Sequence, residues 1–269
     1  MATVPNNTVT SFADERNYLA DQTYFTKFSI ILALIIIFGF AQFAARGIVD
    51  VSAAPIWVHI HGVMMLAWLG LFVSQNILIQ RGAIKYHLKL GWFSLFLAFA
   101  VVVLTCFAGY MAVALGRQPP FFSGPYFVAL VYVEAIVFLA VIIWAITKRK
   151  ETQWHRRLMF GATIVILAPA FGRLLPLPLM GDWGEWVVLL VQLGFVALIA
   201  RHDRRVLGLV HPAAVGVGVI VIAVHVVVTA LAFFPPLVSF CGIGCGGRLE
   251  TISRGYRRTL MRLIQAPGA

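Results

Sequence analysis

The strongest constraint on this chain is a series of long apolar blocks that contain almost no charge. A helix that crosses the hydrocarbon core of a bilayer needs roughly 20 apolar residues. Only 12% of the 269 residues are charged, against roughly 25% in soluble domains, so the chain cannot coat a water-exposed surface. We therefore predict an all-α integral membrane bundle of about seven transmembrane helices. The predicted spans are 27–46, 55–79, 88–114, 125–147, 157–176, 183–200 and 212–234.

The pattern divides the chain into three parts. Residues 1–26 are a polar segment, residues 27–234 form the helical bundle, and residues 235–269 form a basic C-terminal tail. No cleavable signal peptide is expected, because the polar start runs directly into a block long enough to span the membrane. In the tail, Cys241 and Cys245 are too few for a complete zinc site, although they could form a disulfide.

Lys and Arg alternate between the predicted loops. The loops after the second, fourth and sixth blocks hold Arg81, Lys85, Lys89, Lys148, Arg149, Lys150, Arg156, Arg157, Arg201, Arg204 and Arg205. By the positive-inside rule these loops and the N-terminus face the cytoplasm, and we expect a bacterial inner membrane. The tail conflicts with this rule, because seven spans place it outside the cell. His202 and His211 are expected to be loop residues without a special role.

The formal net charge of +11 raises the question of a nucleic-acid partner. The cationic residues cluster in short loops between apolar blocks, so the expected partner is a lipid bilayer with anionic headgroups and not nucleic acid. A membrane-protein partner or a homo-oligomer stays open.

Polar side chains inside the blocks are the candidates for function, because an ionisable group in lipid is costly. Glu134 lies in the middle of the fourth block, and His61 shares a helical stripe with Gln75 in the second. Arg173 lies near the outer end of the fifth block, and His225 near the centre of the seventh. We predict that these five form one polar intramembrane site that opens toward the periplasm. The alternative is that they only support packing, or that Arg173 reaches the interface.

Two blocks open in a similar way. His87-Leu-Lys-Leu-Gly-Trp-Phe begins the third, and His155-Arg-Arg-Leu-Met-Phe-Gly begins the fifth. Each follows a basic loop, which favours a repeated hairpin. We expect both histidines at the cytoplasmic ends of their helices, where they either serve a site or lie hydrated at the interface.

With His61, Gln75, Arg81 and the run His87-x-Lys-x-x-Gly-Trp, the chain resembles uncharacterised polytopic bacterial membrane proteins of the domain-of-unknown-function type. In those proteins a His-Arg-x-x-Gly-like element opens a helix after a polar-striped one. The resemblance covers about residues 55–175 and implies the same kind of membrane bundle.

The chain is also distantly similar to b561-type cytochromes, whose four-helix core carries haem-ligating histidines on four successive helices. The likeness implies that His61, His87 and His155 bind haem b or another metal ion. The fourth helix of the core offers Glu134 where those cytochromes have a ligand, and His225 could replace it only in a different helix arrangement.

Three functions follow as hypotheses for a multi-pass inner-membrane protein with a polar His/Glu/Arg site. The chain could be an accessory subunit of a membrane complex, a b-type haem or metal-binding redox protein, or a proton-coupled small-molecule transporter. Phosphate-binding loops and serine-hydrolase motifs are absent from the sequence. Whether the chain is an enzyme stays open.

Overall fold

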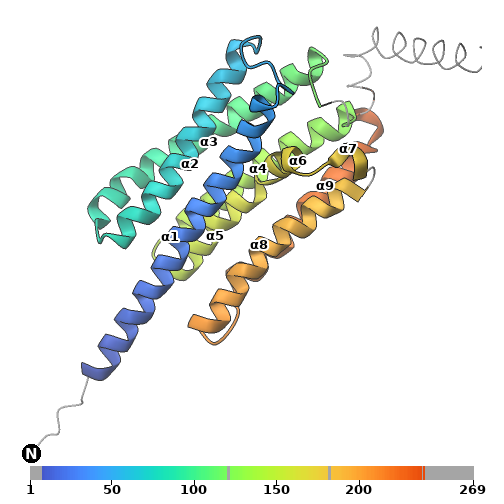
Figure 1. Cartoon of the computed structure of the whole chain (residues 1–269). Helices are drawn as coiled ribbons and strands as arrows, with labels where there is room; N and C mark the ends of the chain where they lie inside the picture. The colour runs from blue at the N-terminus through green and yellow to red at the C-terminus, as the bar shows by residue number, and fades with distance from the viewer. Residues whose placement is uncertain (1–7, 120–121, 181–182, 238, 240–269) are drawn as a thin grey trace, which may run out of the picture.

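The structure, a computed structural model, describes residues 8–119, 122–180, 183–237 and 239. Helices make up the fold in these ranges, and no strand is found in them (Figure 1). The helices are α1 (Thr8–Ala45), α2 (Ile56–Gln80), α3 (Ile84–Ala114), α4 (Gly124–Thr147), α5 (Thr152–Val165), α6 (Ala168–Leu174), α7 (Leu177–Met180), α8 (Gly184–Val206) and α9 (Pro212–Ala232). Cys241, Cys245 and nearly all of the basic tail lie outside the described residues.

Within the described ranges, six helices are long and apolar enough to cross a membrane: residues Asp21–Ala45 of α1, and the whole of α2, α3, α4, α8 and α9. Helices α5 and α6 add a seventh span that is bent by 45° at a short break. The chain is therefore an all-α, multi-pass membrane bundle of about seven transmembrane helices, as the apolar blocks predict.

The bend in the seventh of these spans follows from one proline. Pro169 is the second residue of α6, and α5 ends four residues earlier at Val165. Proline has no N–H, so it cannot bond the carbonyl of Val165 as a regular helix would. The break therefore leaves backbone oxygens in the middle of the bundle that need other partners.

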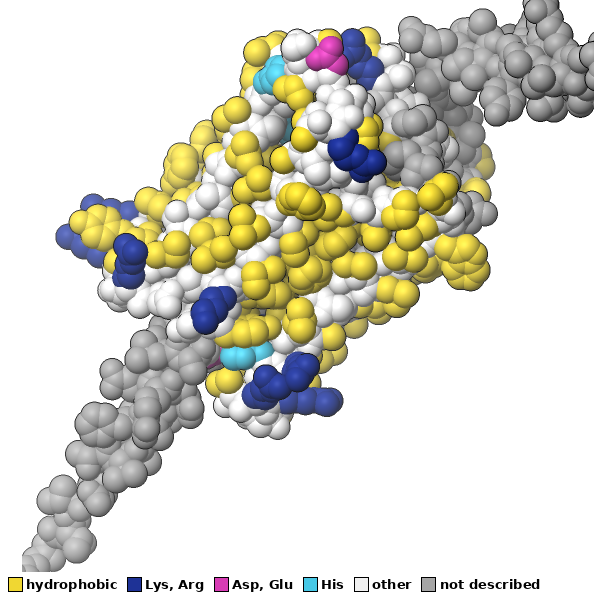
Figure 2. Space-filling model, in the orientation of Figure 1, with side chains coloured by type: hydrophobic (Ala, Val, Ile, Leu, Met, Phe, Trp, Pro, Cys, Tyr) yellow, Lys and Arg dark blue, Asp and Glu magenta, His cyan; other side chains and the backbone are white. Residues whose placement is uncertain are grey.

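Helix α4 occupies the centre of the bundle and contacts α3, α5 and α9. Helix α1 packs on α2 and α6, while α8 packs on α9, α5 and α6. Large apolar side chains face outward as well as inward: Phe93, Phe96 and Phe99 of α3 are 55%, 67% and 56% exposed. Figure 2 shows hydrophobic side chains over the middle of the molecule and Lys and Arg toward its ends, as a lipid-facing surface requires.

Close helix contacts depend on glycine at two positions. A Cβ on Gly39 of α1 would lie 2.9 Å from the backbone oxygen of Ala170 in α6. A Cβ on Gly161 of α5 would overlap the side chain of Val217 in α9. Small residues bring membrane helices together in this way, and here they seat the broken span against both α1 and α9.

The turns α2–α3, α4–α5 and α8–α9 lie together at one end of the bundle, called here the basic end (Figure 1). Three groups of cations expected in its loops belong to helices instead. Arg156 and Arg157 are buried in α5, Arg201, Arg204 and Arg205 lie in the last turns of α8, and Lys85 and Lys89 lie in the first turns of α3. The assignment of these residues to loops is wrong because the helices extend further toward the basic end than their apolar blocks.

Candidate functional site

The first buried polar cluster lies beside the break between α5 and α6. Gln192 of α8 donates hydrogen bonds from Nε2 to the backbone oxygens of Ile164 (2.8 Å) and Val165 (3.0 Å). Its Oε1 lies 2.6 Å from Nε2 of His225 in α9. Gln192 is 1% exposed and supplies the partners that the interrupted helix lacks. The same side chain thus joins the broken span to His225.

The cluster continues through a carboxyl group. Nδ1 of His225 lies 2.6 Å from Oε1 of Glu185, at the start of α8. The hydroxyl of Tyr126 in α4 bonds the other oxygen of Glu185. Tyr126, Glu185, His225 and Gln192 therefore form one hydrogen-bonded chain, which we call the relay chain, from α4 through α8 and α9 to the break.

The relay chain fixes where a proton can sit. The amide nitrogen of Gln192 is used by two carbonyls, so its oxygen faces His225, and Nε2 of His225 must carry a hydrogen to donate. The remaining ring nitrogen, Nδ1, then shares one proton with the Glu185 carboxyl. His225 is buried and Glu185 is part-buried, with 1% and 17% of their side chains exposed.

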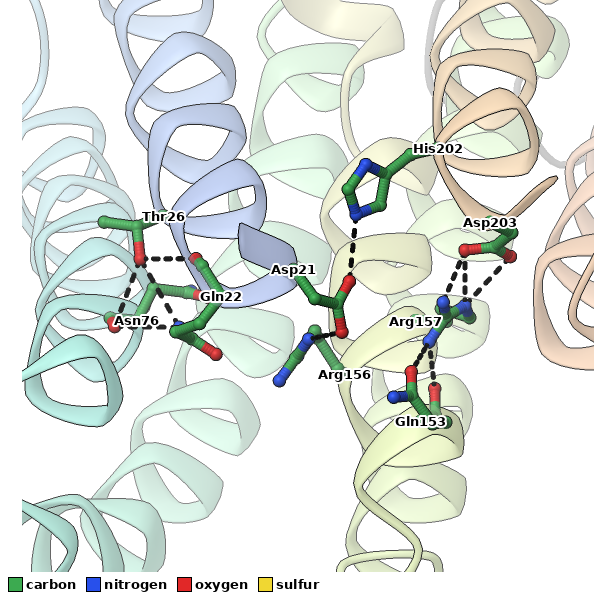
Figure 3. Close-up of polar contacts among 9 residues, drawn as sticks. All are labelled: Asp21, Gln22, Thr26, Asn76, Gln153, Arg156, Arg157, His202 and Asp203. Atoms are coloured by element: carbon green, nitrogen blue, oxygen red, sulfur yellow. Dashed lines mark hydrogen bonds and ion pairs between the residues drawn. The ribbon is translucent and has the colours of Figure 1, made fainter. Parts of the chain in front are cut away.

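The second cluster lies near the basic end and consists of charges on three helices (Figure 3). Asp21 of α1 bonds Arg156 of α5 through one oxygen and lies 2.9 Å from Nε2 of His202 in α8 through the other. Arg157 of α5 donates from Nε to both oxygens of Asp203 in α8, each at 3.0 Å. Two carboxylates thus face two guanidinium groups, all at most 7% exposed. We call these residues the ion-pair cluster.

Neighbouring bonds join the ion-pair cluster to the rest of the fold. Tyr24 of α1 stacks on the His202 ring at 3.7 Å between centroids. Gln22, next to Asp21 in α1, donates to the backbone oxygen of Asn76 in α2 at 3.1 Å (Figure 3). Asp203 also accepts the backbone N–H of His211 at 3.1 Å. His202 is therefore a helical, bonded residue, contrary to the expectation of a loop residue.

His211 caps α9 and has a part in the fold as well. Its Nδ1 accepts the backbone N–H of Ala213 at 3.1 Å, so this nitrogen must be unprotonated. Burial lowers the pKa of His211, and the nearby charge of Arg157 lowers it further. The ring is thus held in its neutral form at the start of the helix.

The third cluster places His87 of α3 beside His155 of α5, with ring centroids 6.4 Å apart and the planes at 83°. Nδ1 of His155 donates to the backbone oxygen of Ala145 in α4 at 2.8 Å. The Gln75 amide of α2 lies 2.5 Å from Nδ1 of His87. Gln75, which shares a stripe of α2 with His61, therefore contacts His87 of the neighbouring helix α3.

The histidine pair offers two of the ligands that the likeness to b561-type cytochromes implies. The Nε2 atoms of His87 and His155 have no hydrogen bond within the described residues, and Nδ1 of His155 donates to a carbonyl as in ligating histidines. Nδ1 of His87 instead accepts the Gln75 amide N–H, which places the hydrogen of the neutral ring on Nε2, so His87 fits this role only after a change of tautomer. No group of three or more His, Cys, Asp or Glu in the described ranges could hold a metal ion. The pair therefore offers two ligands of the kind that a haem takes, and fewer than a metal ion held by three or four side chains needs.

The buried polar atoms without a hydrogen-bond partner in the described structure include Nδ1 of His61, Nε1 of Trp68 and Oε1 of Glu134, besides Oε1 of Gln22 and Oε1 of Gln118. His61 lies close enough to Arg173 to interact with its charge. Nη1 of Arg173, however, donates to the backbone oxygen of Pro169 at 2.7 Å. Its guanidinium carbon also lies 4.1 Å from the centre of the Phe40 ring. Arg173 therefore stays against α1 and its own helix.

The five residues predicted as one site divide among these clusters. His61, Glu134 and Arg173 lie on α2, α4 and α6, while Gln75 bonds near His87 and His225 belongs to the relay chain. Within the described residues, no hydrogen bond joins His225 to His61, Glu134 or Arg173. Of the histidines considered as metal ligands, only His87 and His155 are neighbours.

Several residues of the relay chain and of the ion-pair cluster were not predicted as site residues from the sequence. Glu185 lies at the start of the predicted span 183–200 and was not singled out, although it contacts His225 from the first turn of α8. Gln192 was visible as a polar residue in the middle of the sixth block, and this signal could have identified it. Asp21 and Asp203 had no comparable signal, because each lies at the polar margin of an apolar block.

A scan against protein-family models and searches among curated proteins and solved structures found no match for this chain.

Proposed function

We propose that this chain is a proton-coupled carrier of a small solute in a bacterial inner membrane. The observation that carries the proposal is the 2.6 Å contact between Nδ1 of His225 and Oε1 of Glu185 inside the relay chain, next to a broken membrane span. Ionisable groups inside membrane bundles mark proton relays and transport sites. Interrupted helices at such depth are typical of transporters, because their free backbone groups line the site.

Protonation of the His225–Glu185 pair changes the hydrogen bonds around the break between α5 and α6. The transfer or loss of a proton at Nδ1 of His225 alters the charge of the ring that bonds Gln192. Gln192 in turn bonds the carbonyls of Ile164 and Val165. Proton binding is therefore linked through one side chain to the geometry of α5 and α6.

The ion-pair cluster is a second contact between α5 and α8, besides the bonds of Gln192 to the break. Helix α5 carries Arg157 near one end and the break at the other, and α8 carries Asp203 near one end and Gln192 in its middle. A tilt of α5 against α8 must disturb both contacts, because a helix of 14 residues moves as a rigid body. We infer that the ion-pair cluster closes the bundle on the side that the positive-inside rule assigns to the cytoplasm, next to anionic headgroups.

Proton uptake into vesicles tests the proposal. The purified chain is reconstituted into liposomes that contain a pH-sensitive dye, and a membrane potential drives protons inward. We expect faster acidification than in protein-free liposomes, and a return to that background in Glu185→Gln and in His225→Gln. Glu151→Gln is the matched control, because Glu151 is exposed and pairs only with Lys148 near the basic end. Wild-type protein that acidifies no faster than empty liposomes refutes the proposal.

A b-type haem protein is the second candidate, favoured by the paired rings of His87 and His155, whose Nε2 atoms have no hydrogen bond in the described part of the chain. The two imidazoles would hold the iron, and the haem would supply one-electron transfer. Purified protein should then show a Soret absorption band that is lost in His87→Ala and in His155→Ala. His59→Ala is the control, because His59 is an exposed residue of α2. A wild-type spectrum without this band eliminates the candidate.

A further inference from the structure

The relay chain and the ion-pair cluster both engage α5 and α8, at different depths in the bundle. Gln192 of α8 bonds the break after α5, while Asp203 of α8 bonds Arg157 near the other end of α5. Along α8, a helical rise of about 16 Å separates Gln192 from Asp203. The side chains between these two clusters therefore decide whether a proton can pass from one to the other.

The helix segments between the two clusters offer almost no hydrogen-bonding side chain. Residues 193–200 of α8 and 212–224 of α9 consist of apolar residues, glycine and one proline. In residues 158–165 of α5, Thr163 carries such a group, but its hydroxyl donates to the backbone oxygen of Met159 in the same helix at 3.2 Å. These three segments therefore contain no side chain that could pass a proton between helices.

Buried apolar side chains of these segments belong to one hydrophobic core, and none of them is more than 8% exposed. We call six of them the apolar layer: Phe160 and Ile164 of α5, Val196 and Ile199 of α8, and Val217 and Val221 of α9. The helices approach so closely that a Cβ on Gly161 of α5 would overlap Val217. Phe25 of α1 covers Phe160, with ring centroids 5.0 Å apart. Because water is costly to place among such side chains, the layer is a barrier to protons.

The relay chain approaches the surface at its other end. Glu185 is 17% exposed, whereas His225 and Gln192 are each 1% exposed. Glu185 lies at the start of α8, and α8 ends at the α8–α9 turn of the basic end, so Glu185 lies toward the opposite end of the bundle (Figure 1). Tyr126, which bonds Glu185, is likewise near the start of α4, far from the α4–α5 turn. Exposure thus decreases from Glu185 inward.

We propose that in this conformation the relay chain exchanges its proton through Glu185 with the side opposite the basic end, and that the apolar layer blocks exchange with the basic side. The inference rests on the proposed function and deepens it, because it assigns the structure to the loading state of an alternating-access cycle. Release toward the basic end then requires α5 and α9 to separate where Gly161 meets Val217.

Cysteine reactivity tests the access of each position without a measurement of transport. In the full chain with the native cysteines replaced by serine, a small membrane-impermeant thiosulfonate is added to intact cells and to inverted vesicles. Ser52→Cys, in the loop before α2, and Lys150→Cys, in the α4–α5 turn, mark the two sides. Glu185→Cys should react at least about tenfold faster from the side of Ser52→Cys, because a minor alternative state is populated at about 10% or less. Val196→Cys and Val221→Cys should react slowly from both sides.

A polar side chain in the apolar layer tests the barrier itself. Val221→Asn gives a water molecule in the layer a hydrogen-bond partner, so proton flux into liposomes should rise about tenfold over wild type. Val219→Asn is the matched control, because Val219 lies on the same helix but is 60% exposed, and it should conduct as wild type. Val217→Ser, with the exposed Val215→Ser as its control, keeps the test decisive if thermal unfolding shows that Val221→Asn is not folded.

The proposal is overturned if Glu185→Cys reacts equally fast from both sides or faster from the side of Lys150→Cys. It is equally overturned if Val221→Cys reacts as fast as Glu185→Cys, or if the folded layer variants conduct as wild type.

These outcomes are distinct from those that test the proposed function. One-sided reactivity of Glu185→Cys in a chain whose wild type takes up no protons refutes the carrier alone. Proton uptake by wild type together with equal reactivity of Glu185→Cys from both sides refutes the one-sided access alone.

Discussion

At the scale of single residues, the side chain of Gln192 decides the chemistry of the relay chain. Its amide nitrogen is committed to two backbone oxygens, and so its oxygen dictates the hydrogen on Nε2 of His225. Glu185 is then left with a single proton to share at Nδ1. One glutamine thus connects the helix break with the His225–Glu185 contact.

Arg157 and Asp203 should illustrate the difference between breaking a buried ion pair and removing it. Arg157→Met leaves the Asp203 carboxylate buried without its partner, and we expect a loss of about 3–5 kcal/mol of unfolding free energy. The double variant Arg157→Met, Asp203→Leu removes both charges and should recover most of this loss. Denaturation in detergent measures both. A double variant as unstable as the single one would contradict the expectation.

His211 should give the fold a dependence on acid. Its pKa in the folded state is lowered by burial, while the unfolded chain has a histidine pKa of about 6.5. Below about pH 6.5 the unfolded state binds more protons, so stability is lost as the pH falls from there toward the folded pKa. His211→Asn keeps a capping acceptor but does not titrate in this range. The melting temperature of wild type should therefore fall more steeply than that of His211→Asn between pH 7 and pH 5. Parallel curves would exclude this role.

At the scale of elements, the broken span determines where backbone oxygens become available. Helices α5 and α6 meet at 45° because Pro169 interrupts the hydrogen-bond ladder after Val165. The remaining spans keep their ladders closed, as lipid demands. The break faces α8, and Gln192 is the residue of α8 that bonds it.

Pro169→Ala should separate stability from transport. The alanine restores an N–H that can bond the carbonyl of Val165, so the helix can straighten and the carbonyl no longer needs Gln192. We expect a melting temperature equal to or above that of wild type, together with slower proton uptake in the liposome assay. Unchanged uptake with a straightened helix would show that the break has no part in the activity.

At the scale of the whole molecule, charged and apolar side chains divide the surface into two charged ends and an apolar middle. Lys and Arg gather toward the ends of the bundle, and exposed apolar side chains cover the middle (Figure 2). Two of the cations counted toward the orientation, Arg156 and Arg157, are buried in α5, yet Lys148, Arg149 and Lys150 still lie in or beside the α4–α5 turn. The basic end is therefore assigned to the cytoplasm as a proposal from its remaining surface charge.

Cysteine labelling in intact cells tests that orientation. With the native cysteines replaced by serine, Ser52→Cys lies in the loop at the end opposite the basic end, and Lys150→Cys lies at the basic end. A membrane-impermeant maleimide should label the first in intact cells and the second only after the membrane is permeabilised. The reverse pattern would place the ion-pair cluster and the N-terminus outside the cell.

Most of the fold follows from the sequence, and only part of the candidate site does. The apolar blocks locate every span within a few residues, and Pro169 locates the bend, because these depend on the local chain and its solvent. His225 and Glu134 were identified because a polar residue inside an apolar block is visible without a structure. Asp21, Asp203 and Glu185 were missed, because a charge at the margin of a block is typical of both a hydrated loop and a buried pair.

By itself the sequence determined that this chain crosses a membrane about seven times and that its buried polar groups need partners, since the transfer of each residue into lipid is a local property. Only the tertiary structure decided which partners they have. His202 bonds Asp21 across 181 positions, and His225 bonds Glu185 across 40. Such pairs depend on how each helix is rotated about its axis and which helices are neighbours, and the periodicity of a single helix contains neither.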